Sequence, residues 1–163
     1  MATVNATVRR TDNTVVGIGE GGTLKAFGTR TIELAPSASG TIVDFKLQIP
    51  SNARLSAASR IYHDDLATSG APTLDIGLYA VNGNITSDDD ALTDGLTLTT
   101  ALVAATGAAV IKDHANSGKR AWEFVNGQTS DPGGVFAVMG VVRDAATITN
   151  TGTITLDLYG YID

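Results

Sequence analysis

Four aspartates gather within seven residues of the sequence, in the stretch "SDDDALTDG" that follows the Asn82-Gly83 turn signal. Carboxylate oxygens of Asp88, Asp90 and Asp94 are the type of ligand that calcium takes. A calcium loop of the D-x-D-x-D-G type, however, has acids at alternate positions and a bidentate acid at its end, whereas these aspartates are consecutive and no Glu follows them. We therefore predict a structural role for the cluster, and a calcium site on these three residues is the alternative.

The same stretch fits a short capped helix. Ser87 stands where an N-cap would lie, and the aspartates that follow would occupy the first turn, where carboxylates oppose the helix dipole. Gly95 suits the left-handed residue that ends a helix. The sequence thus predicts one short helical segment over residues 87–95.

The other candidate chemistries have less support. His63 and His114 are the two histidines, and no G-x-S-x-G elbow accompanies them. The chain has no cysteine, so it has neither thiolate ligands nor a thiol nucleophile. Residues 17–22 match G-x-G-x-x-G, but Gly28 interrupts any helix that could follow. We predict no catalytic residue, no cofactor and no enzymatic activity; a hydrolase is the remote alternative.

Alternating apolar and polar residues predict strands that would position these groups. The pattern runs through residues 41–49, 73–81 and 152–162, where every second residue is apolar. The composition agrees, because 18 Gly and only 4 Lys and 3 Glu leave few strong formers of surface helices. The residues expected to face one common core are Val43, Phe45, Leu47, Ile49, Leu74, Ile76, Leu78, Ala80, Ile154, Leu156, Leu158 and Ile162.

The run "VFAVMGVV" over residues 135–142 is apolar on both faces, which predicts a central strand covered on both sides. Shorter strands are expected at "TIEL", "RLSAASRIY", "AAVIK" and "RAWEFV". Eight or nine strands without a long helix predict an all-β fold, a two-sheet antiparallel β-sandwich and most specifically a jelly roll. We assign this domain to residues 29–163.

Residues 1–28 are polar and rich in glycine, which predicts an extended N-terminal arm held by a partner. The net charge of -6 argues against nucleic acid as that partner. The sequence also lacks an apolar run long enough for a membrane span and the apolar core of a secretory signal. The residues expected to contact another subunit or a larger surface are Val4, Arg9, Arg10, Phe27, Tyr159 and Tyr161.

Three stretches resemble a family of small structural proteins of tailed bacteriophages, the head decoration or virion proteins. They are "LDIGLYAVNGNITSDDDALTDGL", "IKDHANSGKRAWEFVNGQTSDPGG" and "GTITLDLYGYI", and the resemblance spans roughly residues 40–163. It implies a virion protein, assembled in the host cytoplasm, that binds the major capsid protein on the outer capsid surface and cements it. It also implies a homo-oligomer, with a trimer favoured.

A carbohydrate-binding or receptor-binding module of a virion spike is the alternative function. Such sites stack sugars on exposed aromatic rings beside acidic loops, and Trp122, Tyr159 and Tyr161 are the candidate rings. A lone Trp in a sandwich more often belongs to the core, and tyrosines on a sheet face often serve subunit contacts.

Overall fold

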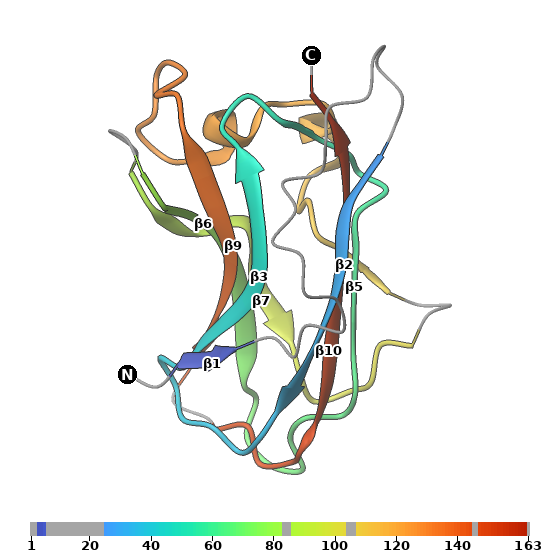
Figure 1. Cartoon of the computed structure of the whole chain (residues 1–163). Helices are drawn as coiled ribbons and strands as arrows, with labels where there is room; N and C mark the ends of the chain where they lie inside the picture. Colours follow the sequence, from blue (N-terminus) through green and yellow to red (C-terminus); the bar gives the residue numbers. More distant parts are fainter. Residues whose placement is uncertain (1–2, 6–24, 83–85, 104–106, 145–146, 163) are drawn as a thin grey trace.

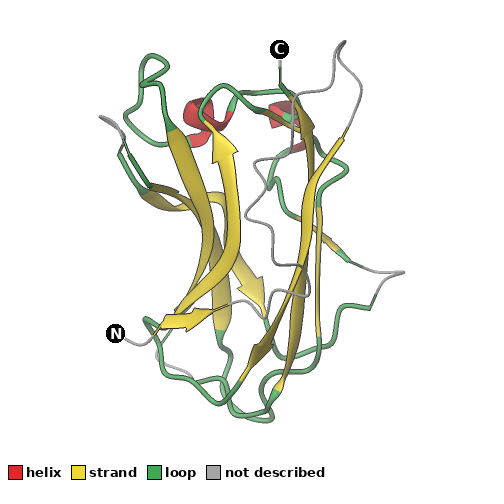
Figure 2. Cartoon of the chain, in the orientation of Figure 1, coloured by secondary structure: helices red, strands yellow, loops and turns green. Residues whose placement is uncertain are grey.

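The computed structural model describes residues 3–5, 25–82, 86–103, 107–144 and 147–162. Two β-sheets pack face to face, as Figures 1 and 2 show, and the predicted antiparallel β-sandwich is confirmed. Two short 3-10 helices join the strands. Among the described residues, no helix has the length and apolar composition that crossing a membrane requires. The elements are β1 (Thr3–Asn5), β2 (Lys25–Leu34), β3 (Ile42–Pro50), β4 (Arg54–Leu55), β5 (Arg60–His63), β6 (Thr73–Ala80), β7 (Asp88–Thr97), β8 (Ala108–Ala109), η1 (His114–Asn116), η2 (Ala121–Phe124), β9 (Val135–Arg143) and β10 (Gly152–Tyr161).

Sheet A has the strand order β1-β3-β9-β6-β7, and sheet B has the order β2-β10-β5-β8, with β4 also paired to β10. Apart from the parallel β1–β3 pair, the paired strands are antiparallel. Strand β2 pairs with the last strand, β10, and β3 pairs with β9, so that one pair lies within the other in chain order. This order is compatible with the predicted jelly roll, which stays a prediction.

The core lies between the sheets and is built by the predicted alternation. Val43, Phe45, Leu47 and Ile49 of β3 are at most 3% exposed, while Lys46 and Gln48 between them are exposed. The predicted inward residues of β6 and β10 follow the same pattern, except that Ala80 is exposed and Ile162 is only partly buried. Burying one face of each strand removes apolar area from water, which is the main favourable term in folding.

Strand β9 occupies the centre of sheet A between β3 and β6, as its apolar sequence predicts. Its inward residues Phe136, Val138 and Val142 are fully buried. Its outer side is also largely buried, as predicted, because Ala137 and Val141 are each 6% exposed, although Figure 1 shows no third layer of strands among the described residues. The outward residues Val135 and Met139 are half-buried, so this side of β9 is only partly accessible within the described part of the chain.

The short helix predicted over residues 87–95 is wrong, because residues 88–97 form β7. Pairing with β6 holds the segment at Asp88 and from Thr93 onwards, and Leu92 and Thr93 are buried in the core. Ser87 is consequently not a helix cap. Its hydroxyl accepts a hydrogen bond from the Ala80 backbone N–H at 3.0 Å, which closes the end of the β6–β7 hairpin.

The strand predicted at "RAWEFV" is also wrong, because residues 121–124 form the 3-10 helix η2. The Glu123 carboxylate accepts a hydrogen bond from the Arg120 backbone N–H at 2.6 Å, which holds the first turn. The Ala121 N–H donates to the carbonyl of Ala53, which ties this end of the helix to the loop after β3. A capped turn with long-range backbone partners therefore prevails over the apolar pattern.

The described part of the predicted arm lies on its own chain. Strand β1 pairs in parallel with β3, and Val4 is aligned with Val43. Strand β2 begins at Lys25, so residues 25–28 of the predicted arm belong to the first long strand of sheet B. Arg9, Arg10 and the glycine motif at residues 17–22 lie outside the described residues, and the role of the arm in binding a partner stays a prediction.

Candidate functional site

The acidic cluster lies in a wide bulge of β7 that rests on Gly77. Ile76 pairs with Thr93 and Leu78 pairs with Asp88, so residues 89–92 of β7 lie opposite Gly77 alone. A Cβ atom on Gly77 would be 2.2 Å from the Asp88 carbonyl oxygen and 2.5 Å from the Asp89 Cα. The close approach of the two backbones therefore requires glycine at this position.

A second bulge follows at Asp94 and Gly95. Here Leu74 pairs with Leu96 and Ile76 with Thr93, so two residues of β7 face Asp75 alone. Gly95 has φ of +74°, which glycine adopts without strain, and its N–H donates to Asp75 Oδ1 at 2.8 Å. The two bulges bend β7 and bring its acidic residues towards the end of β9.

Arg143, the last residue of β9, joins the two strands electrostatically. Its Nε donates to Asp75 Oδ2 at 2.8 Å, and its Nη2 donates to Asp89 Oδ2. Asp75 is only 7% exposed, and a buried charge is costly unless it is paired. The Arg143 guanidinium and the Gly95 N–H compensate it. The arrangement fixes the bulge of β7 to the centre of sheet A.

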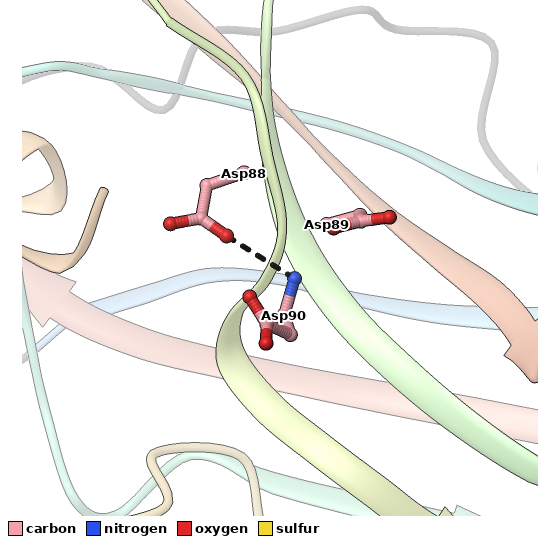
Figure 3. Close-up of side chains that lie close together, drawn as sticks. All are labelled: Asp88, Asp89 and Asp90. Carbon is pink, nitrogen blue, oxygen red and sulfur yellow. Dashed lines mark hydrogen bonds between the residues drawn. The ribbon is translucent and has the colours of Figure 1, made fainter. Parts of the chain in front are cut away.

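Asp90 lies in the same bulge and Asp88 bounds it, and Figure 3 shows Asp89 on the opposite side of the β7 ribbon from Asp88. Asp88 accepts backbone hydrogen bonds from Asn126 at 2.6 Å and from Asp90 at 3.4 Å. A hydrogen bond with the Asp88 side chain raises the pKa of the Asp90 carboxyl, with burial and the nearby acidic charges adding to this effect. Protonation of Asp90 is thus favoured relative to a free aspartate.

The cluster offers one cation a set of three carboxylates. One oxygen each from Asp88, Asp89 and Asp90 lies within 4.8 Å of the others. Two of these carboxylates already have protein partners, whereas calcium takes about six to eight oxygen ligands. Asp94, the third residue of the predicted calcium set, instead pairs with Lys112 at 2.7 Å. The described contacts therefore account for a structural bulge, and the calcium site stays a prediction.

The two histidines lie in unrelated places. His63 is 4% exposed at the end of β5, with Nδ1 2.7 Å from the Asp64 carbonyl oxygen, while its Nε2 has no partner among the described residues. His114 is exposed in η1. Trp122 packs against the core from η2, and its indole nitrogen is likewise without a described hydrogen-bond partner. Trp122 therefore has the core-packing role that is usual for a lone Trp in a sandwich.

The aromatic residues predicted to contact a partner differ in how far their side chains are exposed to solvent. Phe27 is 5% exposed and belongs to the core, where a Cβ atom on Gly160 would approach its ring to 2.3 Å. Tyr159 and Tyr161 are half-buried on β10, opposite in direction to the core residues of that strand. The hydroxyl of Tyr161 lies near Gly118 of its own chain. Their contact roles stay predictions.

Asp75, Gly77 and Arg143 are the residues of this site that sequence reasoning missed. Arg143 follows an apolar strand, and Asp75 is the acidic residue within another strand. Opposite charges on two predicted strands are the available signal, but the pairing of β6 with β9 must be known to bring Asp75 and Arg143 together.

Comparison with known proteins establishes a shared fold. No family model matches the chain, and no curated protein matches it in sequence. A chain of the capsid asymmetric unit of cyanophage Pam1 superposes with a TM-score of 0.58 at 17% identity, over 96% of this chain and 95% of that chain. A chain of the capsid of Ralstonia phage GP4 superposes with a TM-score of 0.59 at 17% identity, over 99% of both chains.

Proposed function

We propose that the protein is a structural component of a phage virion that binds the outer surface of the capsid shell and stabilises it through contacts repeated by the shell's symmetry. The observation that carries the proposal is the likeness in fold, over nearly the whole length of both chains, to chains of two phage capsid assemblies. The sequence resemblance over residues 40–163 supports the same role. Shared fold alone does not determine function, so the role requires a direct test.

The architecture suits a mechanical role. One continuous core lies between the two sheets. Each sheet contains a pair of long strands that are far apart in sequence, namely β2 with β10 and β3 with β9. A body of this kind is suited to a mechanical role, because opening its long paired strands would break buried core contacts. Many copies, each bound weakly, hold a shell together when one chain or its oligomer bridges two shell subunits. The major capsid protein is the proposed partner, and a trimer is the proposed oligomer.

Binding to capsids assembled without this chain tests the proposal. Purified protein should co-sediment with the capsids, saturate at a fixed ratio to the shell protein, and raise the temperature at which the capsids release their contents. Analytical ultracentrifugation of the free protein measures the oligomer. Saturable binding without stabilisation would contradict the cementing role, and no binding would contradict the proposal as a whole.

The glycan-binding alternative has less structural support. Trp122, its best stacking platform, packs against the core, and Tyr159 and Tyr161 are only half-exposed. A glycan array with the isolated protein separates the two functions, because binding to a defined sugar would favour the module.

A further inference from the structure

The two outer faces of the sandwich differ in polarity. On sheet B, the outward residues of β10 include Thr153, Thr155 and Asp157, and the Thr155 hydroxyl hydrogen-bonds with that of Thr31 on β2 at 2.8 Å. This is the polar outer face that a solvated antiparallel sheet normally has. On sheet A, the central strand β9 is apolar on its outer side as well as its inner side.

Strand pairing gathers these outward residues into one apolar patch. Cross-strand register places Ile42 and Val141 side by side, and likewise Ala137 and Tyr79. Ala137 and Val141 are each 6% exposed, and the other members are half-buried. We call this surface the sheet A patch. Its members are Ile42, Tyr79, Val135, Ala137, Met139 and Val141.

A charged rim borders the sheet A patch. On the β7 side, the bulge lies against Gly77, which is paired with Met139 in the sheet. Asp89 in this bulge accepts a hydrogen bond from Arg143. On the β3 side, Lys46 pairs with Asp44 at 2.6 Å. Acidic residues outnumber basic ones around the patch. The accessible rim consists of Asp88, Asp89 and Asp90 together with Lys46 and Arg143, whose buried ion-pair partners are Asp44 and Asp75.

Tyr79 connects the patch to this rim. Burial raises the pKa of its phenol, the Arg143 guanidinium opposes this shift, and Asp75, Asp88 and Asp90 add to it. The phenol therefore lies in a partly desolvated place, within reach of both the arginine and the acidic residues of the rim. An apolar centre with a polar, charged border is the usual composition of a protein interface.

The charge of the rim selects among possible occupants. A second copy would place two acidic rims together, which is unfavourable, and the whole chain carries a net charge of -6. A partner with lysines or arginines around an apolar centre would instead be complementary. We infer that the sheet A patch is the face through which this chain docks on the shell, against a shell-protein surface with an apolar centre and a basic rim. The identity of the partner rests on the proposed function.

One pair of matched variants tests this inference. Met139→Lys places a charge at the centre of the sheet A patch, and Thr155→Lys places the same charge on the central strand of sheet B, at a similarly half-buried position. With capsids assembled without this chain as the probe, Met139→Lys should weaken binding by about tenfold or more, as loss of a central interface residue does. Thr155→Lys should bind like the natural chain. Met139→Gln, which adds no charge, serves if Met139→Lys does not fold.

The rim is tested by a second pair. Asp89→Asn should slow association with the capsids and reduce its dependence on salt, because exposed charges steer encounter. Asp157→Asn on sheet B should change neither. Circular dichroism and thermal melting confirm that each variant is folded.

The outcomes separate this inference from the proposed function. If the natural chain binds and Thr155→Lys abolishes binding while Met139→Lys does not, sheet B is the docking face and the inference alone fails. If Met139→Lys instead removes self-association of the free chain, a second copy occupies the patch and the inference is overturned. If the natural chain does not bind capsids, both the proposed function and the inference fail.

Discussion

Substitution of Gly77 by alanine tests the account of the acidic bulge. The new Cβ atom would lie 2.2 Å from the Asp88 carbonyl oxygen and 2.5 Å from the Asp89 Cα. Ordinary contacts between carbon atoms are about 3.5–4.0 Å, so the backbone of β7 must move away. That movement breaks the Asp89–Arg143 ion pair and disturbs the hydrogen bond between Asp88 and Asn126.

Overpacking of this kind costs about 1–3 kcal/mol. The loss of an exposed ion pair adds at most about 1 kcal/mol. Alanine also reduces the entropy of the unfolded chain, which offsets about 0.4–1 kcal/mol. The expected net loss is about 1–3 kcal/mol, which for a chain of this length lowers Tm by roughly 3–10 °C.

Gly95→Ala is the matched control, because Gly95 is in the same strand but a Cβ atom there meets nothing within 4 Å. Its φ of +74° should cost about 1 kcal/mol through strain, without displacing the bulge. A double-mutant cycle distinguishes the two variants. Asp89→Asn should destabilise the Gly95→Ala chain but have little effect in Gly77→Ala, where the ion pair is already broken. An unchanged or higher Tm for Gly77→Ala would refute the close packing of β7 on Gly77.

Four further predictions concern other parts of the fold. Leu156→Asp places an unpaired charge at a fully buried position and should prevent folding, so a soluble variant with an unchanged melting curve would contradict the assignment of β10. Ser87→Ala should cost about 1 kcal/mol in chemical denaturation, because it removes the acceptor that closes the β6–β7 hairpin. The pKa of Asp90 is raised in the folded chain, so ionisation of this carboxyl at higher pH opposes folding. Asp90→Asn should therefore raise Tm at pH 7 but not well below pH 3.8. Added calcium should not change the Tm of the natural chain at pH 7. Chains that carry both Thr3→Cys and Ile42→Cys should form an intrachain disulfide if β1 stays on its own β3, whereas a disulfide between separately substituted chains would show that the arm pairs with a neighbour.

The long strands could be predicted because their signal is local. Alternation along residues 41–49, 73–81 and 152–162 depends only on which face of a strand meets the core, and the structure buries the expected residues except Ala80 and, in part, Ile162. The position of β9 in the centre of sheet A followed from its uniform apolarity in the same way. That both its faces are largely buried without a third layer of strands among the described residues did not follow, because an apolar run shows that two faces are buried but not what buries them.

The segments that were mispredicted depend on distant partners. In residues 87–95, the local preferences for a capped helix are weaker than pairing with β6, which holds the segment on both sides of a wide bulge. In residues 121–124, the backbone bonds to the loop after β3 set the conformation. The requirement for glycine at position 77 arises from a second strand lying against it. Arg143 and Asp75 are 68 residues apart, so only the fold brings them together.

A cryo-EM map of purified virions tests the central claim most directly. The account predicts density for this sandwich on the outer surface of the capsid, repeated with the symmetry of the shell, with sheet A turned towards the major capsid protein. Density restricted to the tail or a spike, or virions that lack the chain altogether, would contradict the proposed role as a capsid-stabilising protein.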